Sequence, residues 1–152
     1  MKIKLVLVSL LFITGLGFVP LLAGTPEQEK AFTDKYKTAF EAKDTATLES
    51  LLYTKDAIPM ALEFYKMMMT EGAGGKIAKI ELIDLSPEDA KKAEEIQEGP
   101  GGVKTKLPLK PTKKLKITVE TKDANGSSSN SSESFIAEKD SKFVIPVPVA
   151  AK

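Results

Sequence analysis

The chain has 152 residues, with 22 basic and 21 acidic side chains and a formal net charge of +1. It contains no His, Cys or Trp, and every basic residue is a lysine. Thiolate nucleophiles, disulfides, Cys/His metal sites and imidazole bases are therefore excluded, as is an arginine fork for phosphate or carboxylate. The near-neutral charge gives no general attraction to nucleic acid. We therefore expect no nucleic-acid partner, no metal and no cofactor.

Residues 1–23 have the layout of a secretory signal peptide. Two early lysines precede a largely apolar run, Pro20 breaks that run, and small residues stand at Ala23 and Gly24. This order is typical of a cleaved export signal. The alternative is a retained membrane anchor, for which the apolar run is short relative to a ~30 Å hydrocarbon core. We predict an exported protein, periplasmic or secreted, with no stable membrane insertion after cleavage.

Helical signals dominate the segment that follows. Thr25 and Gln28 have the spacing of a capping box, with Pro26 at the first helical position between them. The apolar residues of the expected helix then recur on one side: Phe32, Tyr36, Ala39 and Phe40. Asp44 is expected to cap a second, short helix that places its leucines on one side.

A third helix is expected to begin at Asp56 as its cap, with Pro59 in its first turn. Apolar residues, Phe64 among them, cover more than half of its circumference, which predicts the most buried helix of the three. Met67, Met68 and Met69 could form an adaptable binding surface. The alternative is that they belong to the core and its margin.

The second half of the chain alternates with a period of two, as half-buried strands do. In the strand expected at 76–85, Ala78, Ile80 and Leu82 share one side. In a second strand the inward side carries Leu115, Ile117 and Val119.

The chain is expected to close with a hairpin around Asp140-Ser141, between strands at 135–139 and 143–149. Pro146 and Pro148 lack backbone donors that would point to the same side of the last strand. This predicts an edge strand that is protected against further pairing.

Two polar segments interrupt this pattern. A helix capped by Ser86 and followed by a glycine-rich stretch forms an expected insertion at about 86–102. A Ser/Asn-rich tract at about 124–133 predicts a low-complexity polar loop, either a long hairpin tip or a disordered segment. We therefore expect a signal peptide over 1–23 and a single α+β domain over 24–149.

Two stretches of sequence resemble one known family. The pattern Phe32-x3-Tyr36-x3-Phe40-Glu-Ala-Lys-Asp44-x3-Leu48-x2-Leu51-Leu52 resembles the opening helices of the nuclear transport factor 2-like superfamily, also called cystatin-like or ketosteroid-isomerase-like. The stretch Ala137-Glu-Lys-Asp-Ser-Lys-Phe143-Val-Ile145 is similar to that superfamily's closing hairpin. The resemblance implies an α+β fold with N-terminal helices packed on a curved antiparallel sheet, a cone-shaped roll whose mouth often holds a small ligand. It also implies a secreted bacterial member of unknown function.

Asp84 is the one candidate catalytic residue. It shares parity with Ile80 and Leu82, so it could face the interior of the cone, where desolvation would raise its pKa and suit it to act as a base. The only tyrosines are Tyr36, Tyr53 and Tyr65, and all are weak candidates for ligand binding or for the acid partner of Asp84. The alternatives are that Asp84 ends a strand and that the tyrosines are amphipathic core residues.

A run of lysines without an intervening acid forms the second candidate: Lys104, Lys106, Lys110, Lys113, Lys114 and Lys116. Such a stripe could attract an anionic polymer. Alternatively, the acids of residues 86–98 neutralise it, and the lysines protect an edge strand from pairing.

Two classes of function follow from these observations. The favoured one is an exported, non-catalytic binding or accessory module of the cell envelope, whose partner is a small ligand or an envelope protein. The alternative is a small cone-pocket enzyme of isomerase or lyase type with Asp84 as base and a tyrosine as acid. A homodimer is an open alternative for the assembly. The predicted core comprises Phe32, Phe40, Leu51, Phe64, Ile80, Ile117 and Phe143.

Overall fold

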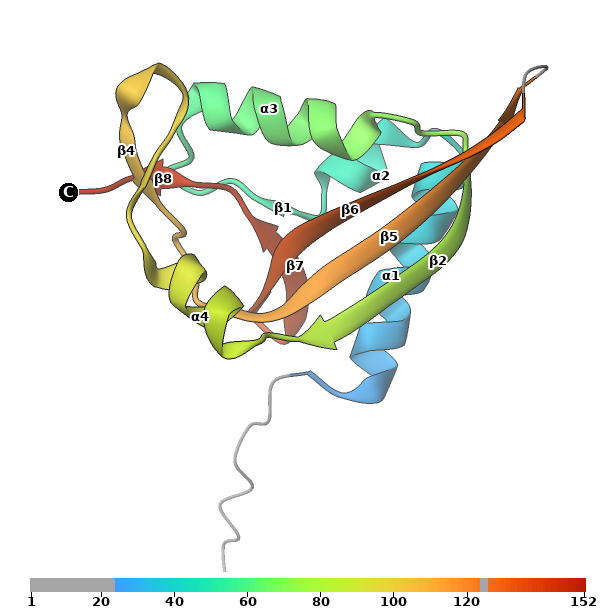
Figure 1. Ribbon diagram of the computed structural model, residues 1–152. Coiled ribbons are helices and arrows are strands. Elements are labelled where there is room, and N and C mark those ends of the chain that lie inside the picture. Colours follow the sequence, from blue (N-terminus) through green and yellow to red (C-terminus); the bar gives the residue numbers. More distant parts are fainter. Residues whose placement is uncertain (1–23, 124–125) are drawn as a thin grey trace, which may run out of the picture.

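The computed structural model describes residues 24–123 and 126–152 (Figure 1). Its elements in chain order are α1 (Pro26–Glu41), α2 (Thr45–Glu49), β1 (Leu52–Tyr53), α3 (Pro59–Thr70), β2 (Lys76–Asp84), α4 (Pro87–Glu94), β3 (Gln97–Glu98), the 3₁₀ turn η1 (Pro100–Gly102), β4 (Lys104–Lys106), β5 (Pro111–Asp123), β6 (Gly126–Lys139), β7 (Lys142–Pro146) and β8 (Val149–Ala150). The signal peptide predicted over 1–23 lies outside the described residues. Within them, no helix is long and apolar enough to cross a membrane.

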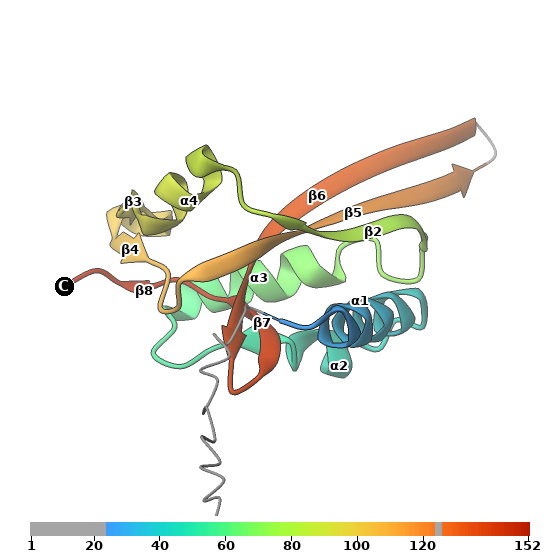
Figure 2. The same ribbon diagram turned by 90° about the horizontal axis from the view of Figure 1, so that it is seen from below.

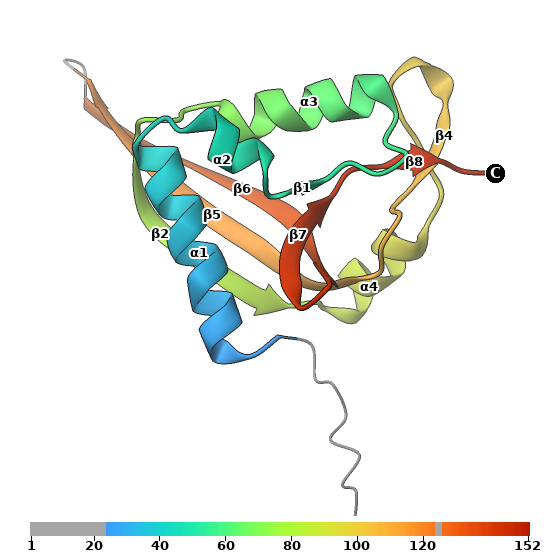
Figure 3. The same ribbon diagram turned by 180° about the vertical axis from the view of Figure 1, so that it is seen from behind.

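The expected α+β class, with helices packed on a curved sheet, is confirmed. Five strands form one sheet in the order β1-β7-β6-β5-β2, and β3, β4 and β8 form a smaller sheet at one end. Figure 2 shows α1, α2 and α3 on one side of the larger sheet, and Figure 3 shows α1 in front of β2 and β5. All pairs in the larger sheet are antiparallel except β1 with β7.

Side-chain caps start the first two helices as predicted. Thr25 and Gln28 make both bonds of the capping box, and the carboxylate of Asp44 accepts from the backbone N–H of Thr47 at 3.0 Å. The predicted cap of the third helix is wrong. The residue before Pro59 is Ile58, which makes no side-chain cap bond, and Asp56 adopts a left-handed φ of 59° two residues earlier. Pro59 stands in the first turn of α3, where the backbone N–H that proline lacks would have had no partner within the helix.

A β-bulge changes which residues of β2 face the helices. Ile77 pairs with Val119 and Lys79 with Thr118, so Ala78 has no partner of its own. The extra residue puts Ile77 on the same side as Ile80 and Leu82, and Ile77 is 1% exposed. The prediction that Ala78 faces inward is therefore wrong, because strict alternation does not hold across the bulge.

The last long strand is interior rather than an edge. β7 pairs with β6 through Val144 and on its other side with β1, where Ile145 and Val147 donate to the carbonyls of Leu51 and Tyr53. The prolines do end pairing on the β6 side, as predicted. The edge assignment is wrong because β1, a strand of two residues, covers the opposite side.

The Ser/Asn tract is a strand rather than a loop. From Gly126 onward it forms β6, which pairs with β5 from Asp123 back to Pro111. Its own residues have low strand propensity, but the alternating residues of β5 supply a partner edge and an apolar face. The resulting hairpin extends beyond the rest of the sheet (Figure 1). The hairpin alternative holds from Gly126 on, and residues 124 and 125 lie outside the description.

The core lies between α1 and the sheet. Five predicted core residues are buried, Phe32, Phe40, Leu51, Ile117 and Phe143, and Ile80 is partly buried against them. Phe64 is a wrong prediction, since 50% of it is exposed. α3 is apolar over more than half of its circumference, and it packs through Ala61, Leu62, Tyr65 and Met69, which leaves Phe64 on the outer side. The prediction that α3 is the most buried helix is also wrong, because only Ala61 and Met69 are buried on it, whereas α1 buries four residues.

Candidate partner-binding groove

Asp84 does not occupy the inward position predicted for it. It is the last residue of β2, and its side chain is 91% exposed. Its carboxylate lies 2.9 Å from Nζ of Lys113, which also lies 2.8 Å from the carboxylate of Glu29 on α1. These bonds, first that to Glu29, raise the pKa of Lys113. A catalytic role for Asp84 stays a prediction, and the exposure of its carboxylate does not provide the desolvated environment that this role would use.

The three tyrosines lie on α1, β1 and α3. Tyr36 is 3% exposed and stacks on Phe40 with ring centroids 6.2 Å apart, and burial raises its pKa to about 12. Tyr53 is half-buried opposite Pro146. Burial also raises the pKa of Tyr65. Of the residues proposed from sequence, Tyr65 lines the cavity at the end of the sheet, and Asp84 does not.

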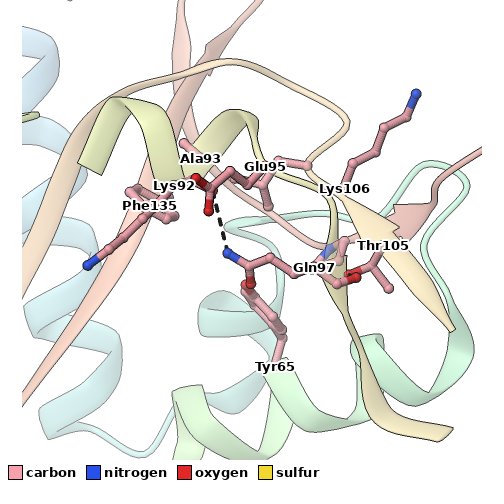
Figure 4. Close-up of a pocket in the computed structure, with 10 residues that line it drawn as sticks. Tyr65, Lys92, Ala93, Glu95, Gln97, Thr105, Lys106 and Phe135 are labelled. Atoms are coloured by element: carbon pink, nitrogen blue, oxygen red, sulfur yellow. Dashed lines mark hydrogen bonds between the residues drawn. The ribbon is translucent and has the colours of Figure 1, made fainter. Parts of the chain in front are cut away.

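That cavity is small because the segment after β2 closes it. It has a volume of about 100 Å³ between Tyr65 of α3, Phe135 of β6, and residues of α4, β3 and β4 (Figure 4). Ala93 and Thr105 are buried there, and the amide of Gln97 donates to the carbonyl of Lys92 at 3.4 Å. Ligand pockets usually measure about 300–1,000 Å³. The end of the roll is therefore largely filled by the chain itself.

Much of the lysine stripe is neutralised, as in the simpler of its two interpretations. Nζ of Lys114 lies 2.9 Å from carboxylates of both Asp89 and Glu133, and Lys110 lies 2.9 Å from Glu94. Hydrogen bonds, first that to Glu133, raise the pKa of Lys114. Two of these acids belong to residues 86–98, as expected.

A second hollow, of about 440 Å³, lies between α1 and the β6–β7 turn. Phe32, Leu51 and Phe143 form its floor, with Lys35 and Lys142 at its rim. The three floor residues are at most 6% exposed, so the hollow presents little apolar surface to a ligand.

The largest exposed apolar side chains lie along α3. Met60, Phe64 and Met67 are 55%, 50% and 60% exposed, and their spacing of four and three residues places them on one side of the helix. We call these three residues the α3 stripe. The segment after β2 reaches the start of this stripe, where Gly101 lies beside Met60, and the same segment carries the exposed side chains of Val103 and Ile96, at 42% and 58%.

The α3 stripe lies next to a hollow between α3 and β6. Met68 lines a cavity of about 400 Å³ with Ser132 and Asn130 of β6, and Phe64 stands one turn before Met68 on the helix. Lys66, about 200° around the helix from Met68, instead pairs with Glu49 of α2 at 3.2 Å. In Figure 1, β6 runs obliquely below α3 and rises toward its C-terminal end. We call the hollow that Met68, Asn130 and Ser132 line the α3–β6 groove.

Sequence reasoning missed this groove. Of the two interpretations of the three methionines, core and margin describes the run better, because Met69 is 2% exposed and Met67 is 60% exposed. The only available signal was that α3 is apolar over more of its circumference than one packed face requires. That excess indicates a second contact surface, but it does not say which residues form it.

No protein-family model matches the chain, and no curated protein matches its sequence. Among solved structures, a chain named Rd1NTF2_05, which carries five substitutions, is similar over 80% of this chain and 95% of its own length. The identity is 8% and the TM-score is 0.38. So distant a likeness carries no inference about function, which we argue instead from the chain's own geometry.

Proposed function

We propose that this protein is an exported, non-catalytic module that binds a partner protein of the cell envelope through the α3–β6 groove. The observation that carries the proposal is the α3 stripe, three large apolar side chains that are each at least half exposed on one helix side. Single exposed apolar residues are common on protein surfaces, whereas contiguous ones mark interaction sites. Export rests on the signal-peptide layout of residues 1–23.

The geometry gives less support to the alternative, an isomerase or lyase. That enzyme would need a carboxylate base and a tyrosine hydroxyl at one enclosed cavity. Asp84 is 91% exposed and tied to Lys113, whereas Tyr65 lines a cavity of about 100 Å³ at another place. We also propose membership of the nuclear transport factor 2-like superfamily, supported by the capped long helix, the short second helix and the closing hairpin. This membership assigns no catalytic residue here.

Site-specific photo-crosslinking in intact cells tests the function. A benzoylphenylalanine replaces Phe64 in one variant and Thr38, on the exposed side of α1, in a matched control. We expect a discrete crosslinked species from position 64 in the envelope fraction, no such species from position 38, and loss of the species when Met60 and Met67 are changed to serine. Equal crosslinking from both positions, or none from position 64, would overturn the proposal.

A further inference from the structure

β6 has a neighbouring strand on only one edge for most of its length. β5 pairs with it from Gly126 to Ala137, whereas β7 pairs only with Ala137, Glu138 and Lys139. In the described part of the chain, no strand adjoins the other edge over residues 126–136. Strand edges are normally blocked by Lys, Pro or a bulge. This one carries Ser and Asn with a single charge, Glu133, which is already bound by Lys114 and Lys116.

The turn after β6 determines which backbone groups face that open edge. Asp140 and Ser141 both have positive φ, at 51° and 59°, and form a two-residue turn that pairs Lys139 with Lys142. In such a hairpin these two residues exchange backbone bonds. Alternation along β6 then directs the N–H and C=O groups of Ser129, Ser131, Glu133 and Phe135 away from β5. The donors of Ile145 and Val147 toward β1 agree with the same alternation in β7.

The α3 stripe flanks the α3–β6 groove rather than lining it, because Phe64 precedes by one helical turn Met68, which lines the groove with Asn130 and Ser132 of β6. Side chains on one face of an extended chain repeat about every 6.8 Å, and Met60 and Phe64, four residues apart on a helix, are separated by about 6 Å along its axis. A strand added to β6 would therefore offer every second side chain to the stripe. Glu71 lines the cavity at the far end of the groove, where it could meet a basic residue of the added strand.

We propose that the open edge of β6, residues 129–135, accepts an extended segment of another protein as an added strand. Its backbone pairs with β6, and its alternate apolar side chains cover the α3 stripe, a recognised mode of peptide binding. The occupant is uncharged along its centre, with a basic residue beside Glu71. A second copy of β6 is a poorer occupant, because its Ser and Asn side chains would leave Met60, Phe64 and Met67 uncovered. This inference rests on the proposed function and adds how the partner binds.

Fluorescence anisotropy with a defined probe tests the inference. The probe is a labelled, acetylated and amidated peptide, Lys-Thr-Val-Thr-Leu-Thr-Val-Thr-Lys. Two control peptides carry N-methyl groups on alternate backbone amides, one peptide for each edge of the strand. A third control peptide replaces Val and Leu by Ser. We expect the probe to bind, and we expect both the N-methylation of one edge and the loss of the apolar residues to weaken binding at least tenfold.

Two variants of the protein separate the inference from the proposed function. Ser131→Pro removes a donor at the open edge and leaves the pairing with β5 intact, and Ser131→Ala is its matched control, since both lose the hydroxyl contact with Thr118. Phe64→Ser removes the centre of the stripe. We expect at least a tenfold loss of affinity for Ser131→Pro and for Phe64→Ser, and little change for Ser131→Ala.

Each other outcome has a definite meaning. If Phe64→Ser weakens binding and Ser131→Pro does not, strand addition is wrong while partner binding by the stripe survives. If the probe does not bind, or neither substitution matters, the inference is overturned, and the crosslinking from position 64 decides the function separately. Sedimentation that found a dimer abolished by Ser131→Pro would identify a second copy as the occupant and overturn the inference.

Discussion

The backbone N–H of Gly24 donates to the carboxylate of Glu138 at 3.0 Å, across 114 positions of sequence. Gly24 has a φ of +63°, and a Cβ there would overlap the ring of Phe143, so no other residue fits without a shift. The bond holds the start of the domain against the β6–β7 hairpin, one residue before the capping box that begins α1. The residue that follows the expected cleavage site, Gly24, is therefore held by a specific contact in the folded domain.

Removal of residues 1–23 should strengthen this contact. The new α-amino group of Gly24 would carry a positive charge beside the carboxylate of Glu138, and the added charge–charge attraction is worth about 0.2–1 kcal/mol. We expect a chain beginning at Gly24 to resist urea better than one beginning at Ala23. Because the protonated amine is the favoured form, the advantage should be present below pH 8, about the usual α-amino pKa, and should fade above it.

Glu138→Gln is the control for this effect, since it keeps an acceptor and removes the charge. The two starting points should then give equal urea midpoints. An advantage of the Gly24 chain that survives Glu138→Gln, or that grows above pH 9, would show that the ammonium–carboxylate pair is not its cause.

Tyr36 should make the protein sensitive to alkali. Burial raises the pKa of its hydroxyl to about 12, whereas an unfolded tyrosine ionises near 10. Between these values the unfolded chain releases a proton that the folded chain retains, so the free energy of unfolding should fall by about 1.4 kcal/mol per pH unit. Urea titrations at pH 8 and 11 measure it. Lysines titrate in the same range, so the comparison is with Tyr36→Phe, which should show a shallower fall than the half-buried control Tyr53→Phe.

Truncation of Phe40 should lower the free energy of unfolding much more than truncation of Phe64. Phe40 is 1% exposed and stacks on Tyr36, so Phe40→Ala should lower the free energy of unfolding by about 3–5 kcal/mol. Phe64 is 50% exposed, so Phe64→Ala should cost less than about 1 kcal/mol while weakening the complex with the probe peptide. Equal destabilisation by the two would show that Phe64 belongs to the core, as the sequence pattern suggested.

The features that could be predicted from sequence are those that neighbouring residues determine. The side chains of Thr25 and Gln28 accept from each other's backbone N–H at the start of α1, and the side chain of Asp44 accepts from that of Thr47 at the start of α2. The alternation of Leu115 and Ile117 sets the inward face of β5 whatever strand lies beside it. The two-residue turn at Asp140 likewise depends on local geometry.

The features that failed depend on distant partners. The bulge at Ala78 is a matter of register between β2 and β5, which no local pattern encodes. The Ser/Asn tract becomes a strand because β5 pairs with it, and its own propensity opposes that outcome. The candidate groove was missed for the same reason, since Met68 of α3 and Asn130 and Ser132 of β6 come together only in the folded chain.

The pairing of β6 predicts an alternating pattern of amide hydrogen exchange in the Ser/Asn tract. The N–H groups of Asn130 and Ser132 point toward β5 and should exchange slowly, with the amide of Ile117, which faces β6, as a reference. The N–H groups of Ser129 and Ser131 face the open edge and should exchange faster. The rate difference is about tenfold for each 1.4 kcal/mol by which the opening free energies of the two pairs differ. The probe peptide should slow the second pair and leave the first pair little changed. Uniformly fast exchange would restore the disordered loop expected from composition. Uniformly slow exchange without peptide would mean that something already covers the edge, and strand addition by a partner would then have no place to occur.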